Sequence, residues 1–290
     1  MCLSKFYLAN GHRRGCRLAW SRLGDLGSLD PGSNPGSPTI LELKAYHAHK
    51  LFMSMHISDS SKGAISTEIM ESIHQVDGVN ANVFLVIDGK ELTVIDTGMP
   101  KNSRKILNYV HKIGRQPSDI SRIVLTHCHT DHVGSAHELV RLTNAKVAVH
   151  QEDADFVAGN KPLPSPKGAT GMVLKAFSFF FRFKPVQPDI MLKENDKVGS
   201  ITVIHTPGHT PGSISLLDTA RKVVFVGDTL RFAKGKISAP PKWVTLDMRQ
   251  ARLSIKKIAG LNFDVMLCGH GAPLRSNASS RVKEFSGSLE

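Results

Sequence analysis

Four side chains that bind metal ions readily fall within the six residues His127-Cys-His-Thr-Asp-His132. The segment follows an apolar run, 123–125, and precedes a helical pattern. Alternate residues of an extended chain project the same way, so His127 and His129 can reach one metal ion together. Asp131 and His132 come where the chain turns into the helix, whose N-terminal dipole favours a carboxylate. Burying four such groups without a cation would be costly, so the segment predicts a metal centre.

Three further candidate ligands each stand just past an apolar run and beside glycine. They are His209 in the turn 206–213 (Thr-Pro-Gly-His-Thr-Pro-Gly-Ser), Asp228 in Gly-Asp-Thr-Leu, and His270 in Cys-Gly-His-Gly. Glycine allows the backbone to turn tightly directly after a strand. We therefore expect these ligands to come from strand ends that meet His127–His132 at one edge of the fold.

Taken in order, the motifs HxHxDH, TPGHTPGS, GDTL and GHGxP, with the loop Ile95-Asp-Thr-Gly98, resemble the metallo-β-lactamase superfamily. The resemblance implies an α/β fold, an αββα sandwich of two packed sheets flanked by helices, with two metals at one sheet edge. It implies that metal 1 is held by His127, His129 and His209, and metal 2 by Asp131, His132 and His270, with Asp228 bridging. Asp96 is then the buried acid that steadies the ligand loops.

This ligand set predicts metal-dependent hydrolysis. Imidazole and carboxylate ligands suit zinc, so we expect two Zn²⁺ ions per chain, with manganese and iron as alternatives. A water shared by two such ions ionises near neutral pH and becomes the nucleophile. Asp131, which would orient that water, is the predicted catalytic residue. No serine or cysteine nucleophile is required, and Cys128 is interpreted as a small residue between ligands.

The remaining histidines are interpreted as core or surface residues, because the metal set is already complete. Those considered are His47, His49, His56, His74, His111, His137 and His205.

Two regions of different composition make up the chain. Residues 1–45 include the Gly/Ser/Pro-rich stretch 27–38 and have no hydrophobic period, which predicts a disordered or dispensable extension. Residues 46–290 form the predicted hydrolase domain. Its patterns predict a hairpin of 83–87 and 92–95, helices at 101–113, 133–142 and 247–259, and strands at 123–125, 146–149, 201–204, 213–217, 223–226 and 265–267. Two strand-rich halves with following helices favour two packed sheets.

The Pro- and Phe-rich segment 159–188 is a predicted insertion with two interpretations. Its core, 172–183, is either a helix buried against the domain or a lid whose aromatic side chains line a substrate pocket. Long insertions in compact domains are often functional, so both interpretations stay open.

Composition does not favour a nucleic-acid partner or a membrane span. The formal charge is +12, but the basic residues are scattered and not interleaved with aromatics, which does not favour a nucleic-acid partner. No apolar run is long enough to span a membrane. The four cysteines form no CxxC pair and no disulfide-like framework, which indicates a reducing cytoplasm.

The leading prediction for the substrate is an ester or lactone bond of a small acyl compound, with N-acyl-homoserine lactone, the target of quorum-quenching lactonases, as an example. Glyoxalase II resembles the GDTL motif, but its following Gly-Cys-Gly-Arg is absent here, where 231–236 reads Arg-Phe-Ala-Lys-Gly-Lys. The alternative is a metallo-β-lactamase acting on β-lactam rings, followed by a thioester hydrolase and a nucleic-acid phosphodiesterase.

Overall fold

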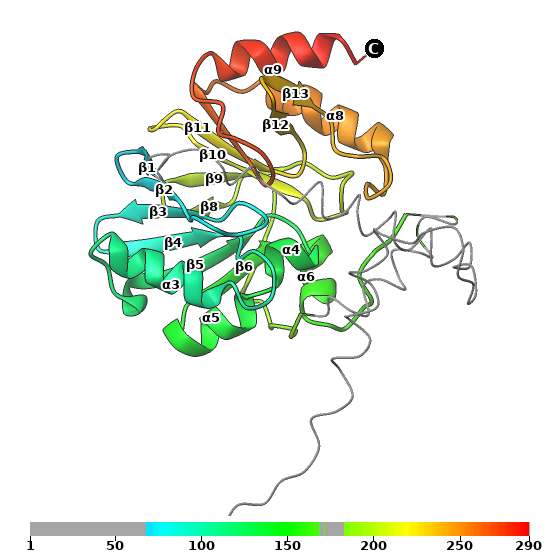
Figure 1. Ribbon diagram of the computed structural model, residues 1–290. Helices are drawn as coiled ribbons and strands as arrows, with labels where there is room; N and C mark the ends of the chain where they lie inside the picture. The colour runs from blue at the N-terminus through cyan, green and yellow to red at the C-terminus, as the bar shows by residue number, and fades with distance from the viewer. Residues whose placement is uncertain (1–67, 167, 169–170, 172–182, 290) are drawn as a thin grey trace, which may run out of the picture. The chain divides into compact units, whose positions relative to one another are not determined.

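The computed structural model describes residues 68–166, 168, 171 and 183–289, all within the compact unit His49–Glu290 (Figure 1). The predicted extension 1–45 lies outside the described residues. So does most of the Phe-rich core of the predicted insertion, 172–182. Among the residues described, no helix is long and apolar enough to cross a membrane.

The first sheet has seven strands in the order of the chain. They are β1 (Glu68–Met70), β2 (Ile73–Gln75), β3 (Phe84–Asp88), β4 (Glu91–Ile95), β5 (Ile120–Leu125), β6 (Lys146–His150) and β7 (Ile190–Leu192). Strands β1 to β4 pair antiparallel, and β4 to β7 pair parallel. The parallel part therefore brings the carboxyl ends of several strands to one edge.

The second sheet has five strands in the order β14-β11-β10-β9-β8. Its strands are β8 (Lys197–Val198), β9 (Ile201–His205), β10 (Ile214–Asp218), β11 (Val223–Gly227) and β14 (Val265–Cys268). Only β11 and β14 pair parallel, so their carboxyl ends lie side by side. A separate hairpin, β12 (Arg231–Ala233) and β13 (Lys236–Ser238), follows β11.

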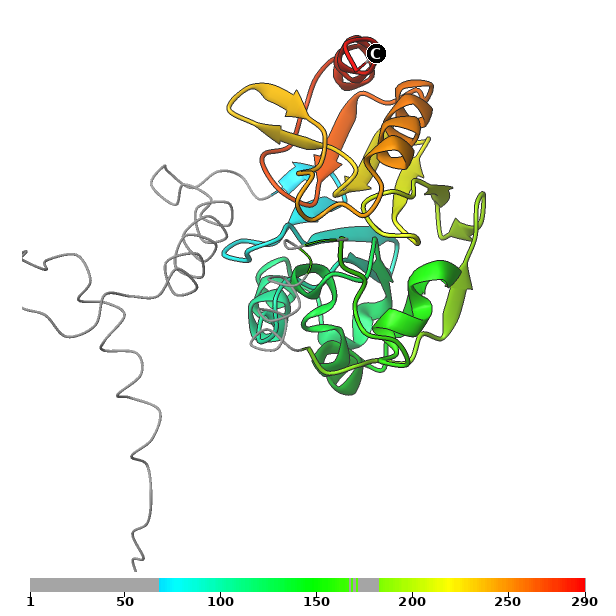
Figure 2. The same cartoon turned by 90° about the vertical axis from the view of Figure 1, so that its right-hand side faces the viewer.

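Helices cover the outer face of each sheet (Figures 1 and 2). The first sheet carries α3 (Ser103–Lys112), the 3₁₀ turn η1 (Pro117–Asp119), α4 (Thr130–Val133), α5 (Ala136–Thr143) and α6 (Gln151–Val157). The second sheet carries α8 (Met248–Ala259) and α9 (Ala278–Gly287). Helix α8 begins at Asp247, whose carboxylate accepts from the backbone N–H of Gln250 at 2.9 Å and so caps the helix.

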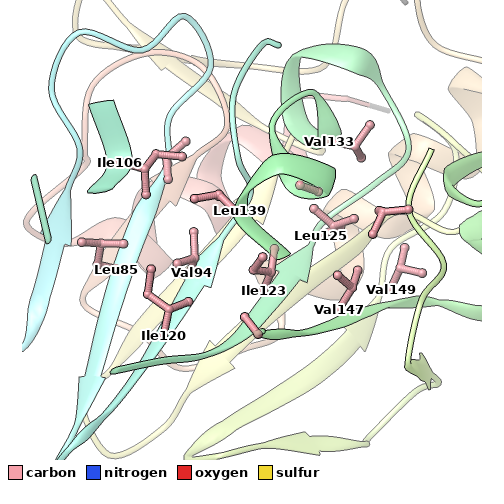
Figure 3. Close-up of a cluster of buried hydrophobic side chains, with 14 of the residues drawn as sticks. Leu85, Val94, Ile106, Ile120, Ile123, Leu125, Val133, Leu139, Val147 and Val149 are labelled. Atoms are coloured by element: carbon pink, nitrogen blue, oxygen red, sulfur yellow. The ribbon is translucent and has the colours of Figure 1, made fainter. Parts of the chain in front are cut away.

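Three buried clusters separate four layers. Since side chains alternate along a strand, Leu85 and Val94 face the helices while Phe84 and Val86 face the other sheet. The helix-side cluster of the first sheet is drawn in Figure 3, with Ile106 of α3 and Leu139 of α5 packed on the strands. A third cluster packs Ile255 and Ile258 of α8 against the second sheet. The predicted αββα sandwich is confirmed.

The cluster between the sheets is centred on an aromatic pair. Phe84 of β3 and Phe225 of β11 meet edge to face, with ring centroids 5.4 Å apart at an interplanar angle of 62°. Both side chains are buried, at 3% and 1% exposed. This pair therefore packs the first sheet against the second in the central layer.

The sequence-predicted elements are present with shifted ends. The helix predicted over 133–142 is α5, which begins three residues later, and a separate short helix, α4, precedes it. The carbonyl of His132 accepts from the backbone N–H and the hydroxyl of Thr97, at 2.7 and 2.8 Å, and is thereby diverted from a continuing helix. Thr97 also accepts from the N–H of Ser135 at 3.2 Å, so the loop after β4 interrupts the helix from outside.

We expect Phe225→Ala to lower the free energy of unfolding by about 3–5 kcal/mol, because it leaves a cavity between the two sheets. Urea unfolding followed by circular dichroism measures the change. Leu253→Ala is the matched control, since that side chain is 53% exposed and should change stability by less than about 0.5 kcal/mol. Equal stability losses in the two variants would contradict the assignment of the central layer.

Candidate metal centre

The seven predicted ligands all follow the carboxyl ends of strands. His127 and His129 come directly after β5, and His129 occupies the N-cap position of α4, with extended backbone angles. His209 lies in the turn between β9 and β10. Asp228 follows β11, and His270 follows β14. Ligands brought together at the carboxyl edge of strands are typical of α/β folds.

The first ligand group consists of His127, His129 and His209, whose ligand atoms lie within 4.8 Å of one another. His129 Nδ1 and His209 Nε2 face each other at 3.0 Å. The ring centroid of His127 lies 4.9 Å from each of the other two rings. Two segments that are about eighty residues apart in the chain therefore present three imidazoles to one point.

The second ligand group consists of Asp131, His132 and His270, also within 4.8 Å of one another. His270 Nε2 lies 3.1 Å from Asp131 Oδ2, and His132 Nε2 lies 3.8 Å from the same oxygen. The two groups are adjacent, because the rings of His127 and His132 have centroids only 4.0 Å apart.

Asp228 stands between the two groups. Its carboxylate oxygens lie 3.6 Å from His209 Nε2 of the first group, and 3.5 and 3.4 Å from Nε2 of His132 and His270 of the second. This position is the one expected of a bridging ligand. The structure thus brings all seven predicted residues together.

Hydrogen bonds on the outer side of three histidines fix which nitrogen faces the centre. Asp96 Oδ2 accepts from His132 Nδ1 at 2.8 Å. The Thr126 hydroxyl donates its hydrogen to Asp96. The Thr126 oxygen lies 3.1 Å from His127 Nδ1 and therefore accepts from that nitrogen. Thr245 donates to the Pro241 carbonyl and stands 3.2 Å from His209 Nδ1 in the same way. Each of these histidines therefore turns its Nε2 atom toward the centre, where a neutral imidazole offers its lone pair to a metal ion.

Burial keeps the first ligand group neutral. Burial, together with His129 nearby, lowers the pKa of His209 to about 3, and burial with His132 nearby lowers the pKa of His127 well below its usual value. A neutral imidazole has the free lone pair that metal binding requires.

The second ligand group carries charge. Burial opposes the charge of His132, but Asp96, Asp131 and Asp228 outweigh it and raise the pKa of this imidazole to about 10. Burial likewise opposes ionisation of Asp228, but His270, His132 and His209 keep its pKa low. The carboxylates are therefore arranged to stabilise positive charge at this point, as a cation site requires.

Three buried polar atoms of the cluster are placed where a metal ion could bind them. His127 Nε2, His132 Nε2 and Asp228 Oδ1 have no hydrogen-bond partner and are inaccessible to solvent. An unsatisfied buried polar atom costs about 1–3 kcal/mol. These residues also form a group whose ligand atoms lie within 4.8 Å of one another. A cation at this position would satisfy all three atoms.

Gly269 leaves room for this arrangement. A Cβ atom at residue 269 would stand 2.3 Å from Asp228 Oδ1 and 2.7 Å from His132 Cε1. The backbone of residue 269 thus passes so close to two ligands that any side chain would displace them.

The predicted supporting role of Asp96 agrees with its contacts, and its left-handed backbone (φ 59°) is a strained conformation for a non-glycine residue. Sequence reasoning missed Thr126 and Thr245. Thr126 could have been found as a polar residue directly before a ligand. Thr245 could not, because it lies 36 residues from His209 and no motif marks it.

The other described histidines stay outside the cluster. His205 stacks face to face on His150, with centroids 3.9 Å apart at 16°, and with Glu152 they have ligand-type atoms within 4.8 Å of one another. Lone pairs lie in the ring planes, so parallel rings direct them side by side rather than to one point. His74 is hydrogen-bonded to the Tyr109 hydroxyl, and His137 is hydrogen-bonded to the Pro185 carbonyl. His47, His49 and His56 lie outside the described residues.

Known proteins share these features. The sequence profile described as the metallo-beta-lactamase superfamily matches residues 76–270. The probable metallo-hydrolase YflN of Bacillus subtilis (strain 168) is 28% identical over 254 residues, which cover 79% of this chain and 96% of that protein. Acyl-coenzyme A thioesterase MBLAC2 of Homo sapiens is 31% identical over 180 residues, which cover 53% of this chain and 59% of that protein.

A solved structure shows the same fold. The metallo-beta-lactamase family protein TTHA1429 from Thermus thermophilus aligns with a TM-score of 0.60 at 19% sequence identity, covering 77% of this chain and 80% of that one. The matched profile contains every residue of the cluster, from His127 to His270. The chain therefore belongs to the metallo-β-lactamase superfamily and is a metal-dependent hydrolase.

Proposed function

We propose that this chain hydrolyses an ester or lactone bond of a small acyl substrate, such as an N-acyl-homoserine lactone, at a dinuclear metal centre. The observation that carries the proposal is the pair of adjacent ligand groups with Asp228 between them. His127, His129 and His209 would hold one ion, Asp131, His132 and His270 the other, and Asp228 would contact both. Two zinc ions suit these nitrogen and oxygen ligands, and manganese or iron could replace them.

Bound metal ions supply two kinds of chemistry, since they polarise a carbonyl oxygen and lower the pKa of water to near neutrality. The chain's own residues supply the rest. Asp228 and four of the five histidines are buried, and His129 is partly buried, so little bulk water reaches the ligand side of the centre. Three imidazoles are held by hydrogen bonds in the orientation that ligation needs, so little reorganisation accompanies the reaction.

Asp131 is suited to orient the attacking water. Its side chain is 18% exposed, against 9% for Asp228 and 10% for His270, so it lies towards the open side of the cluster. A carboxylate there can accept a proton from the water and hold it in line with the carbonyl of a bound substrate. Cys128 has no such role, because burial and Asp153 raise the pKa of its thiol well above the usual value.

A hydrolysis panel tests the proposal directly. We expect the metal-loaded protein to hydrolyse N-acyl-homoserine lactones or p-nitrophenyl esters faster than nitrocefin or bis-p-nitrophenyl phosphate. A chelator should abolish this activity, and zinc, manganese or iron should restore it, because the nucleophile requires the metal. Rates are measured at equal protein concentration with metal content determined in parallel. Preference for nitrocefin would replace the lactone proposal with a β-lactamase, and preference for the phosphodiester would replace it with a nuclease.

Replacement of Asp131 by Ala should lower kcat by about 10²–10⁴-fold in metal-loaded protein, because positioned proton acceptors contribute about that much. Steady-state kinetics with metal analysis of the same samples measures the effect. Asp264→Ala is the matched control, since the Asp264 side chain is 64% exposed and pairs with Lys222 at the surface. A near-normal kcat in the metal-loaded Asp131 variant would show that another group orients the water.

A specific observation favours acyl-coenzyme A thioesters as a second candidate substrate. A groove of about 450 Å³ is lined by Lys242, Arg249, Arg252 and Lys256 together with apolar Met248, Leu253 and Leu289. Lys242 lies three residues before Thr245, which contacts His209, so a short stretch of chain connects the lining of the groove to the metal centre. Its cations complement the phosphates of a coenzyme A moiety. The relatives named acyl-coenzyme A thioesterase support the same substrate class.

The double variant Arg249→Glu/Arg252→Glu tests whether the groove binds the phosphates of an acyl-coenzyme A. If the groove binds the nucleotide phosphates, this variant should lower kcat/KM for an acyl-coenzyme A at least tenfold, because favourable charge pairs become repulsive. Activity toward the matched acyl-N-acetylcysteamine thioester, which has no phosphate, should stay unchanged. Lys90→Glu/Lys146→Glu changes net charge equally at the opposite strand ends and serves as control. Equal rates of wild-type protein on both thioesters would exclude the groove from substrate binding.

A further inference from the structure

A second buried carboxylate, Asp153, contacts the segments of the metal centre without belonging to it. Asp153 lies in the first turn of α6 and is completely buried. Its Oδ2 accepts from the backbone N–H of Cys128 at 2.8 Å and from the hydroxyl of Thr210 at 2.7 Å. Its Oδ1 accepts from the backbone N–H of Gly212 at 2.7 Å. A buried carboxylate with three donors makes strong, charge-assisted hydrogen bonds.

All three donors lie close in sequence to residues of the first ligand group. Cys128 lies between His127 and His129, while Thr210 and Gly212 follow His209. The two segments that Asp153 joins therefore carry the whole first ligand group. None of the three donors belongs to the segments of His270 or Asp228.

Asp96 contacts the centre in a different way. Its Oδ2 accepts directly from His132 of the second ligand group at 2.8 Å, and from the hydroxyl of Thr126, which lies beside His127 of the first group. Asp153 instead acts through backbone and hydroxyl groups that neighbour the ligands. The two carboxylates follow different strands, β4 and β6, and of the two only Asp153 joins the His127–His129 segment to the His209 turn.

The contact between the His209 turn and α6 is closely packed at Gly212. A Cβ atom at Gly212 would stand 2.5 Å from the Asp153 backbone N and 2.7 Å from its Cβ and Cγ. The His209 turn can therefore approach α6 only because residue 212 is glycine. Neither α6 nor this contact was predicted from the sequence.

We propose that Asp153 is a positioning residue that locks the His127–His129 segment to the His209 turn before metal binds, and so sets the affinity of the first ligand group. The inference rests on the proposed dinuclear centre. An amide at residue 153 would replace one accepting oxygen by a donor that faces N–H or O–H groups, which separates the two segments. The second ligand group keeps its own support from Asp96.

Zinc titration of metal-free protein against a chromophoric chelator tests this inference without any substrate. Wild-type protein should bind two ions. His209→Ala and His270→Ala should each remove one binding step and thereby identify the steps of the first and second groups. Asp153→Asn should weaken the first-group step about 10–100-fold, as losses of outer-shell partners commonly do, and leave the second unchanged.

Asp218→Asn is the matched control, because Asp218 is also a fully buried carboxylate but pairs with Arg221 at the other end of β10. It should lower the melting temperature with both affinities intact. Thr210→Val removes one donor to Asp153 and should weaken the first-group step several-fold even if Asp153→Asn does not fold.

The outcomes separate the two proposals. Wild-type protein that binds fewer than two ions would overturn the dinuclear centre itself. Two ions bound with wild-type affinities by Asp153→Asn or Thr210→Val would overturn only the role of Asp153. Equal weakening of both steps in Asp153→Asn, or weakening of the first-group step in Asp218→Asn, would reduce Asp153 to a general stabilising residue.

Discussion

The rest of the structure depends on one constraint, which is that many metal-binding side chains must be held close together in a buried position. Five histidines and two aspartates converge at one sheet edge, and three of their atoms have no hydrogen-bond partner. In a medium of low dielectric such a cluster is costly until a cation neutralises its carboxylates and binds its lone pairs. The scaffold must therefore hold the cluster together before metal arrives, and most of the described polar contacts around it do so.

The sandwich provides this rigidity. Phe84 and Phe225 pack the two sheets against each other, and the candidate ligands that follow β5 and β11 lie close together although they belong to different halves of the chain. Asp96 and Asp153 then tie individual ligand segments to the strands behind them. Gly269 and Gly212 allow backbone to pass close to these groups. The core thus packs the two sheets together, and the two carboxylates hold the candidate ligand segments against those sheets.

Several elements surround this support at the open side of the cluster. Asp131 lies towards the open side, the hairpin β12–β13 follows Asp228 closely, and α8 begins soon after Thr245, which contacts His209. Loops and added elements at the carboxyl edge of strands vary more freely than the sheets, so one metal centre can serve several acyl substrates within a superfamily. For the proposed acyl-coenzyme A substrate, the cationic side chains of the groove at α8 are the groups that would bind phosphate.

The sequence by itself determined which candidate ligands meet in the cluster and the two-sheet architecture, because metal-binding side chains recur after apolar runs and such runs mark each long strand. His127–His132 is a local motif, and hairpins such as β3–β4 arise from neighbouring residues. Tertiary structure alone decided the short strands β1, β2 and β8, the break between α4 and α5, and the partners Thr245 and Asp153. These depend on contacts between residues far apart in the chain, such as Thr97 with His132, which leave no periodic pattern for sequence reasoning to detect.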